Sequence, residues 1–75
     1  MSDNAAPTTV KELDAWLKPH NGKAYVISSS FEDWRVQGSL FIGATYVEVT
    51  RENPHLDLAI IMVYQELKTV LGLPL

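Results

Sequence analysis

The chain has 75 residues, of which 47% are hydrophobic and 20% charged, and its net charge at pH 7 is −3. This length allows one domain with a small core. Because there is no cysteine, disulfides, thiolate zinc sites and cysteine nucleophiles are excluded. The longest apolar run, Leu58–Tyr64, is far shorter than the roughly 20 residues of a membrane-spanning helix. Met1–Asn4 lacks the basic and apolar start of a secretory signal, so we expect a soluble cytoplasmic domain.

The N-terminal residues 1–8 show no apolar periodicity and contain Pro7. We expect these residues to form a disordered tail. The apolar patterns that indicate regular structure begin after them. We therefore expect residues 9–75 to form a single α+β domain.

The first predicted element is a short helix over about Val10–Leu17. Thr9 and Glu12 match a capping box, in which the Thr9 hydroxyl accepts a first-turn N–H and the Glu12 carboxylate accepts the Thr9 N–H. The apolar residues that follow recur at helical spacing. Pro19 disfavours helical backbone at the residue before it, and Asn21-Gly22 is typical of a turn. The helix should therefore end before this turn.

Three strands are predicted next, because the apolar residues begin to alternate from Lys23 onward. Two of the strands span Trp34–Ile42 and Thr45–Arg51, with turns at Glu32-Asp33 and Gly43-Ala44. Such short connections predict an antiparallel meander, since parallel strands need a long crossover. In the first strand one face should carry Tyr25, Ile27, Ser29 and Phe31, and the other Ala24, Val26 and Ser28. The residues expected to face the final helix are Trp34, Val36, Leu40, Ile42, Val47 and Val49.

The last predicted element is a long helix over about Pro54–Leu71. Asn53 is placed to cap its first amides, and Pro54 suits the first helical position. Gly72 suits the left-handed residue after the helix, and Pro74 prevents continuation. Its apolar stripe consists of Leu56, Ile60, Val63, Leu67, Val70 and Leu71. The predicted fold is α+β, in the order α-β-β-β-α, with a three-stranded antiparallel meander and a long apolar C-terminal helix.

No residue pattern in the chain indicates an active site. His20 and His55 lie far apart in sequence, whereas a zinc site needs three or four ligands in defined geometry. The serines of 28–30 lack the Gly-x-Ser-x-Gly context of an activated nucleophile. The adjacent Glu32 and Asp33 would point to opposite faces of a strand. We therefore expect no catalytic, metal or cofactor-binding residues, and a protein that is not an enzyme.

The most informative feature is the segment Leu58–Tyr64, which is apolar on every side. A helix that packs on one core normally has a polar face, so two interpretations remain open. In one, the sheet and the first helix cover the whole segment. In the other, which we favour, part of the segment meets a second protein chain, most simply in a homodimer. The residues predicted for this interface are Leu58, Ile61, Met62 and Tyr64.

A nucleic-acid-binding domain is the alternative function. Double-stranded-RNA-binding domains share the order of one helix, three antiparallel strands and a second helix, and they hold phosphates with clustered basic residues. Here the six Lys and Arg residues are scattered, and the segment Glu52–Asp57 at the start of the final helix is acidic. A small enzyme is the third possibility, which would need a cleft that joins His55 to two carboxylates.

Two stretches, Leu13–Trp16 and Pro54–Ile61, resemble small phage or prophage accessory proteins. Those proteins pair a short Trp-containing first helix with a sheet and an apolar last helix. The resemblance implies an accessory protein that binds a protein partner, including inhibitors of host defence or host enzymes, and it transfers no functional residue. The sequence thus predicts a small non-enzymatic protein-interaction module, homodimeric or bound to a protein partner.

Overall fold

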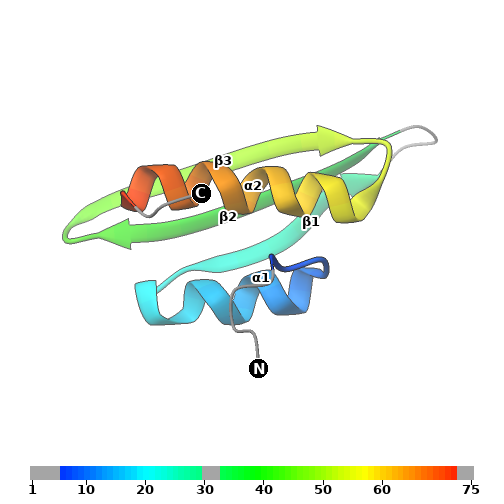
Figure 1. Cartoon of the computed structure of the whole chain (residues 1–75). Coiled ribbons are helices and arrows are strands. Elements are labelled where there is room, and N and C mark those ends of the chain that lie inside the picture. Colours follow the sequence, from blue (N-terminus) through cyan, green and yellow to red (C-terminus); the bar gives the residue numbers. More distant parts are fainter. Residues whose placement is uncertain (1–5, 30–32, 73–75) are drawn as a thin grey trace, which may run out of the picture.

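The computed structural model describes residues 6–29 and 33–72, with the backbone alone for residues 28 and 29. Within these ranges the chain forms one helix, three strands and a second helix (Figure 1), which confirms the predicted α+β order. Phe31 and part of the predicted turn before the second strand lie outside the described residues. The elements are α1 (Val10–Leu17), the 3-10 helix η1 (Lys18–His20), β1 (Lys23–Ser29), β2 (Trp34–Ile42), β3 (Thr45–Asn53) and α2 (Leu56–Leu71).

The three strands form one antiparallel sheet in the order β1-β2-β3, as the predicted meander requires. β2 and β3 pair along their whole lengths, from Ile42 opposite Thr45 to Trp34 opposite Asn53. Gly43 opens the two-residue turn between them and has a φ of 63°. A positive φ at this position suits a tight hairpin turn, and glycine adopts it without steric cost.

β1 is interrupted by a bulge at Ile27. Val26 pairs with Val36, whereas Ser28 already pairs with Arg35, so Ile27 has no partner residue in β2. An extra residue shifts all later positions to the other face of the strand. The strict alternation predicted along this strand is therefore interrupted at Ile27.

α1 begins at Val10, as predicted, because Thr9 caps it. Thr9 Oγ1 accepts a hydrogen bond from the Glu12 N–H at 3.1 Å. The return bond of the capping box is displaced by one residue, since the Glu12 carboxylate accepts the N–H of Thr8 at 2.8 Å. The Thr8 hydroxyl donates to the same carboxylate oxygen at 3.3 Å. The carboxylate thus ties the helix to the residue before its cap.

The predicted tail over residues 1–8 is corrected at its C-terminal end. Residues 1–5 lie outside the described part of the chain. Pro7, however, is buried, and Ala6 packs against the core. Their apolar surfaces cover part of the core beside α1, so the folded domain includes residues before Thr9.

α2 begins two residues later than predicted, at Leu56. Asn53 is the last residue of β3, where it pairs with Trp34, and so it is not the helix cap. Its side chain instead organises the turn, because Asn53 Oδ1 accepts the His55 N–H at 2.9 Å. The predicted end is confirmed: Gly72 has a φ of 77°, and its N–H bonds to the carbonyls of the last helical turn.

α1 and α2 pack on the same face of the sheet, α1 over β1 and β2, and α2 over β2 and β3 (Figure 1). Gly38 of β2 lies beneath both helices. A Cβ there would lie 2.7 Å from Val63 Cγ1 and 3.6 Å from Leu17 Cδ1, so the missing side chain lets α2 approach the sheet closely. The buried apolar core consists of Leu13, Leu17, Ala24, Val36, Leu40, Val49, Ala59, Ile60, Val63, Tyr64 and Leu67.

Two residues predicted for the face beneath α2, Trp34 and Ile42, are exposed at the two ends of β2. The reason is length. A nine-residue strand spans about 30 Å, whereas the 16 residues of α2 span about 24 Å. Val36, Leu40 and Val49 of the predicted face are buried as expected. Val47 is half-buried against the core, and the ends of the face extend past the helix.

Candidate interaction surfaces

The four residues predicted as an interface separate into two groups. Leu58 and Met62 are exposed, at 43% and 37%, and Ile61 is half-buried. Tyr64 is only 9% exposed, and its ring packs edge-on against Trp16 of α1, with 4.7 Å between the ring centroids. Tyr64 is therefore a core residue that joins the two helices, and it is removed from the predicted interface.

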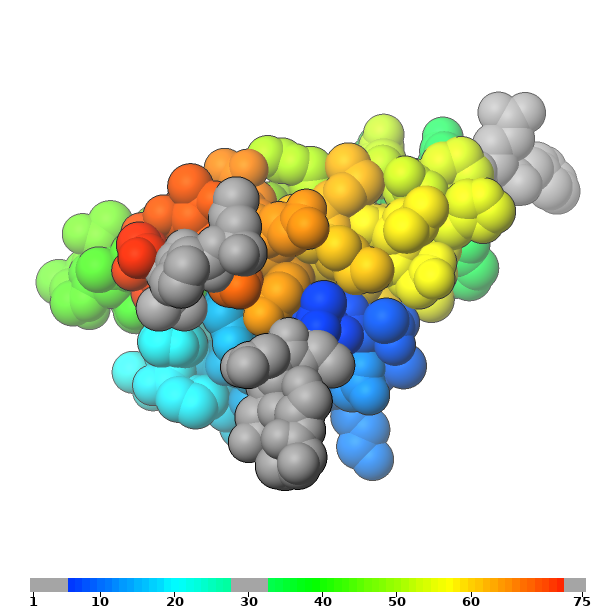
Figure 2. Space-filling view, viewed as in Figure 1, coloured from blue at the N-terminus to red at the C-terminus, as the bar shows by residue number. Residues whose placement is uncertain are grey.

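The remaining apolar residues lie on different sides of the exposed surface of α2. Ile61 is one helical turn from Tyr64 and two from Lys68, so it lies on the α1 side. Met62 lies on the β3 side, where the Asn53 side chain approaches its sulfur at 3.7 Å. Figure 2 shows α2, yellow to orange, across this face of the molecule, with the blue residues of α1 beside it.

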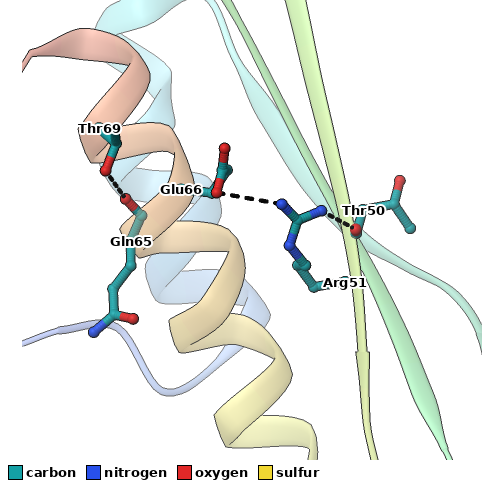
Figure 3. Close-up of polar contacts among 5 residues, drawn as sticks. All are labelled: Thr50, Arg51, Gln65, Glu66 and Thr69. Atoms are coloured by element: carbon teal, nitrogen blue, oxygen red, sulfur yellow. Dashed lines mark hydrogen bonds and ion pairs between the residues drawn. The ribbon is translucent and has the colours of Figure 1, made fainter.

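The β3 side of α2 carries a ridge of residues four apart: Met62, Glu66 and Val70. Such residues line up along a helix. The ridge is tied to β3 at two points, by the Asn53–Met62 contact and by an ion pair of 3.2 Å between Arg51 Nη2 and Glu66 Oε1 (Figure 3). Met62 and Val70 are exposed, so this flank combines apolar ends with a charged centre.

The face of the sheet opposite the helices is a second exposed surface, which the sequence reasoning did not single out. Neither α1 nor α2 covers it, because both pack on the other face (Figure 1). The alternation of residues along the strands could have indicated this face, because its residues lie between those of the core in the sequence. Its exposed large side chains include Tyr25, Phe41 and Tyr46.

A polar network crosses this open face. Gln37 Nε2 donates to Tyr25 Oη at 2.8 Å and to Glu48 Oε2 at 2.5 Å. Tyr46 Oη donates to the same Glu48 oxygen at 2.9 Å, and the rings of Phe41 and Tyr46 lie 5.3 Å apart. The network links all three strands, and it holds the Glu48 carboxylate between two donors.

The free edge of β3, which pairs with no further strand among the described residues, is a third candidate surface. β3 is an outer strand of the sheet, so alternate backbone groups point away from β2. Thr50 illustrates this arrangement, because its carbonyl accepts a hydrogen bond from Arg51 Nη1 at 2.7 Å (Figure 3). A regular strand with such an edge can pair with a further strand.

Within residues 6–29 and 33–72, no three His, Cys, Asp or Glu side chains are grouped so that they could hold a metal ion. Asp14, which borders an open hollow between α1 and β1, accepts the Ala24 N–H at 3.0 Å. That bond gives Asp14 a structural role, because it joins α1 to the first strand.

Three of the six basic side chains lie beside carboxylates. Both arginines of the chain are paired with carboxylates, Arg35 with Glu52 and Arg51 with Glu66. Lys18 lies 4.0 Å from Asp14. Phosphate binding depends on unpaired positive charge, and these contacts place negative charge beside three basic side chains.

None of the helices formed by the described residues has both the length and the apolar character needed to cross a membrane. No family model matches this chain, and comparisons with curated proteins and with solved structures find no match either.

Proposed function

We propose that this protein is a non-enzymatic protein-interaction module that acts in the cytoplasm and forms a homodimer through the exposed part of α2. The observation that carries the proposal is the exposure of Leu58 and Met62 on a helix whose opposite side fills the core. Removing apolar surface from water stabilises an association by roughly 25 cal/mol per Å². Exposed apolar side chains on a domain this small are therefore candidates for burial against a second protein.

A second copy of the chain is the simplest partner, because a two-fold axis brings the same patch of both copies together. The exposed large apolar side chains of α2 are Leu58 and Met62 in its first half and Val70 in its last turn. The resemblance to small phage accessory proteins extends the proposal to a host protein as another partner.

The proposal is tested by sedimentation of the wild type and of a variant with Leu58→Lys and Met62→Lys, over a wide range of protein concentration. We expect a dimer for the wild type and a folded monomer for the variant, because two lysines cannot be buried at the interface without a large desolvation cost. Gln65→Lys is the control, since it adds a lysine at an exposed polar position of the same helix without removing apolar surface.

Circular dichroism shows whether each variant keeps its fold. A wild-type chain that sediments as a monomer at every concentration would contradict the homodimer. A double variant that still dimerises like the Gln65→Lys control would place the interface away from Leu58 and Met62.

A further inference from the structure

We infer that the second copy binds at the free edge of β3, so that the two three-stranded sheets join into one continuous antiparallel sheet with its two-fold axis at Val49. This inference rests on the self-association proposed above and specifies its geometry. It requires that the edge is open to pairing, that its side chains are compatible with themselves, and that α2 of each copy fits beside the other.

The edge of β3 is better suited to pairing than the edge of β1. β3 is a nine-residue strand that pairs with β2 without a register shift. β1 is broken by the bulge at Ile27, and bulges blunt sheet edges. β3 also contains no proline, which would remove a backbone donor.

The direction of the backbone groups is visible at Thr50. Its carbonyl accepts from the Arg51 side chain, which lies on the helix-covered side where Arg51 also meets Glu66. Because outward-pointing groups alternate along a strand, Glu48 and Thr50 belong to the set that points away from β2. A carbonyl has two lone pairs, so Thr50 can accept a partner amide while it keeps its bond to Arg51.

Charge selects the register of the paired edges. With the axis at Val49, all nine residues of β3 pair, Glu48 lies opposite Thr50, and Tyr46 lies opposite Glu52 of the second copy. With the axis at Glu48, the two Glu48 carboxylates would oppose each other. With the axis at Thr50, Glu48 would oppose Glu52 twice. Like charges directly opposite destabilise a sheet, so the complete register is also the electrostatically favoured one.

The helices fit this arrangement. α2 packs on β2 and β3 alike, and neighbouring strands lie about 4.8 Å apart. The axis of α2 therefore lies about 5 Å from the two-fold axis, and the two copies of α2 lie about 10 Å apart, which is the separation of packed helices. The flank that faces the second copy is the ridge of Met62, Glu66 and Val70, whose apolar ends are exposed in the single chain.

The test measures the dimer dissociation constant of the full chain by sedimentation. Two variants are compared, one with a negative and one with a positive side chain at position 50 of the β3 edge. Thr50→Glu puts a carboxylate opposite Glu48 at two symmetry-related points. We expect the dimer dissociation constant to rise about tenfold. Thr50→Lys puts an ammonium group there instead, and we expect a tighter dimer. Glu48→Lys combined with Thr50→Glu should restore dimerisation, because it re-creates opposite charges across the edge.

Lys23→Glu on β1 is the control, since it changes charge at the other edge of the sheet and should leave the dissociation constant unchanged. If glutamate and lysine at position 50 change the dissociation constant in the same way, the β3 edge is not the interface. The proposed homodimer then forms through another surface. If the wild type is a monomer, the homodimer itself fails. If Thr50→Glu does not fold, Thr50→Lys decides: a tighter dimer supports the edge, and an unchanged one overturns it.

Discussion

Glu12 shows how a single side chain secures the N-terminal end of the fold. Its carboxylate accepts hydrogen bonds from the N–H and the hydroxyl of Thr8, while its own N–H donates to Thr9 Oγ1. The Thr8 N–H is the main reason that the pKa of Glu12 lies below its ordinary value of 4.5, because a donor to the charged form favours it. The charged carboxylate is thus the form that holds Thr8 beside α1.

The lowered pKa of Glu12 predicts how stability depends on pH. A carboxyl group whose pKa is depressed by folding contributes stability above its unfolded pKa and loses it as the pH falls through the folded one. Glu12→Gln should therefore lower the urea midpoint at neutral pH, and the difference from wild type should shrink as the pH falls below 4.5. Urea titrations across this range test it. A difference that stays constant in acid would show that the charge of Glu12 is not involved.

At the scale of elements, the position of α2 on the sheet depends on Gly38. The nearest atoms to a Cβ at this residue would be Val63 Cγ1 at 2.7 Å and Leu67 Cδ1 at 3.0 Å. Both side chains belong to the buried stripe of α2, so they cannot move away without moving the helix or changing rotamer. The close packing of α2 on β2 therefore requires a glycine at position 38.

Gly38→Ala should accordingly destabilise the domain by about 1–3 kcal/mol, the usual cost of overfilling a packed core. The change is measured as a shift of the denaturant midpoint at constant slope. Lys11→Ala is the control, because Lys11 is exposed on α1, where a surface substitution costs no more than about 0.5 kcal/mol. Equal stability of Gly38→Ala and wild type would mean that α2 lies further from β2 than these distances indicate.

At the scale of the whole molecule, the fold has a layer of helices and a sheet, and one face of the sheet is covered by neither helix. Helices on a single face leave the aromatic and polar side chains of the other face in solvent (Figure 1). In the edge-paired dimer, the open faces of the two copies would form one continuous surface. The chain carries nine acidic and six basic residues, and both arginines are already paired.

This charge distribution predicts that the protein does not bind duplex DNA or RNA at physiological salt. Non-specific binding requires several phosphate contacts by Lys and Arg, each of which releases counterions, and three of the six basic side chains, Lys18, Arg35 and Arg51, lie beside carboxylates. A gel-shift titration with duplexes of both kinds tests the prediction. Micromolar affinity that falls as salt is raised would contradict it and favour the alternative suggested by the α-β-β-β-α order.

The sequence alone determined the features that depend on neighbouring residues. The Thr9 cap, the hairpin at Gly43 and the Gly72 terminus were all predicted, because each depends on a few consecutive backbone conformations. The strand and helix periods likewise identified the elements and their order. Two of the four residues predicted for an interface, Leu58 and Met62, are exposed, as contact with a second chain requires.

Only the tertiary structure decided which apolar residues are covered. Tyr64 is buried because α1 lies against it, and Trp34 is exposed because β2 is longer than α2. Asn53 belongs to β3 because it pairs with Trp34 across the hairpin, which delays the start of α2. Each outcome depends on contacts between residues far apart in sequence, on the relative lengths of packed elements and on the placement of both helices on one face. Local periodicity contains none of these quantities, so the open face and the free edge of β3 emerged only with the assembled fold.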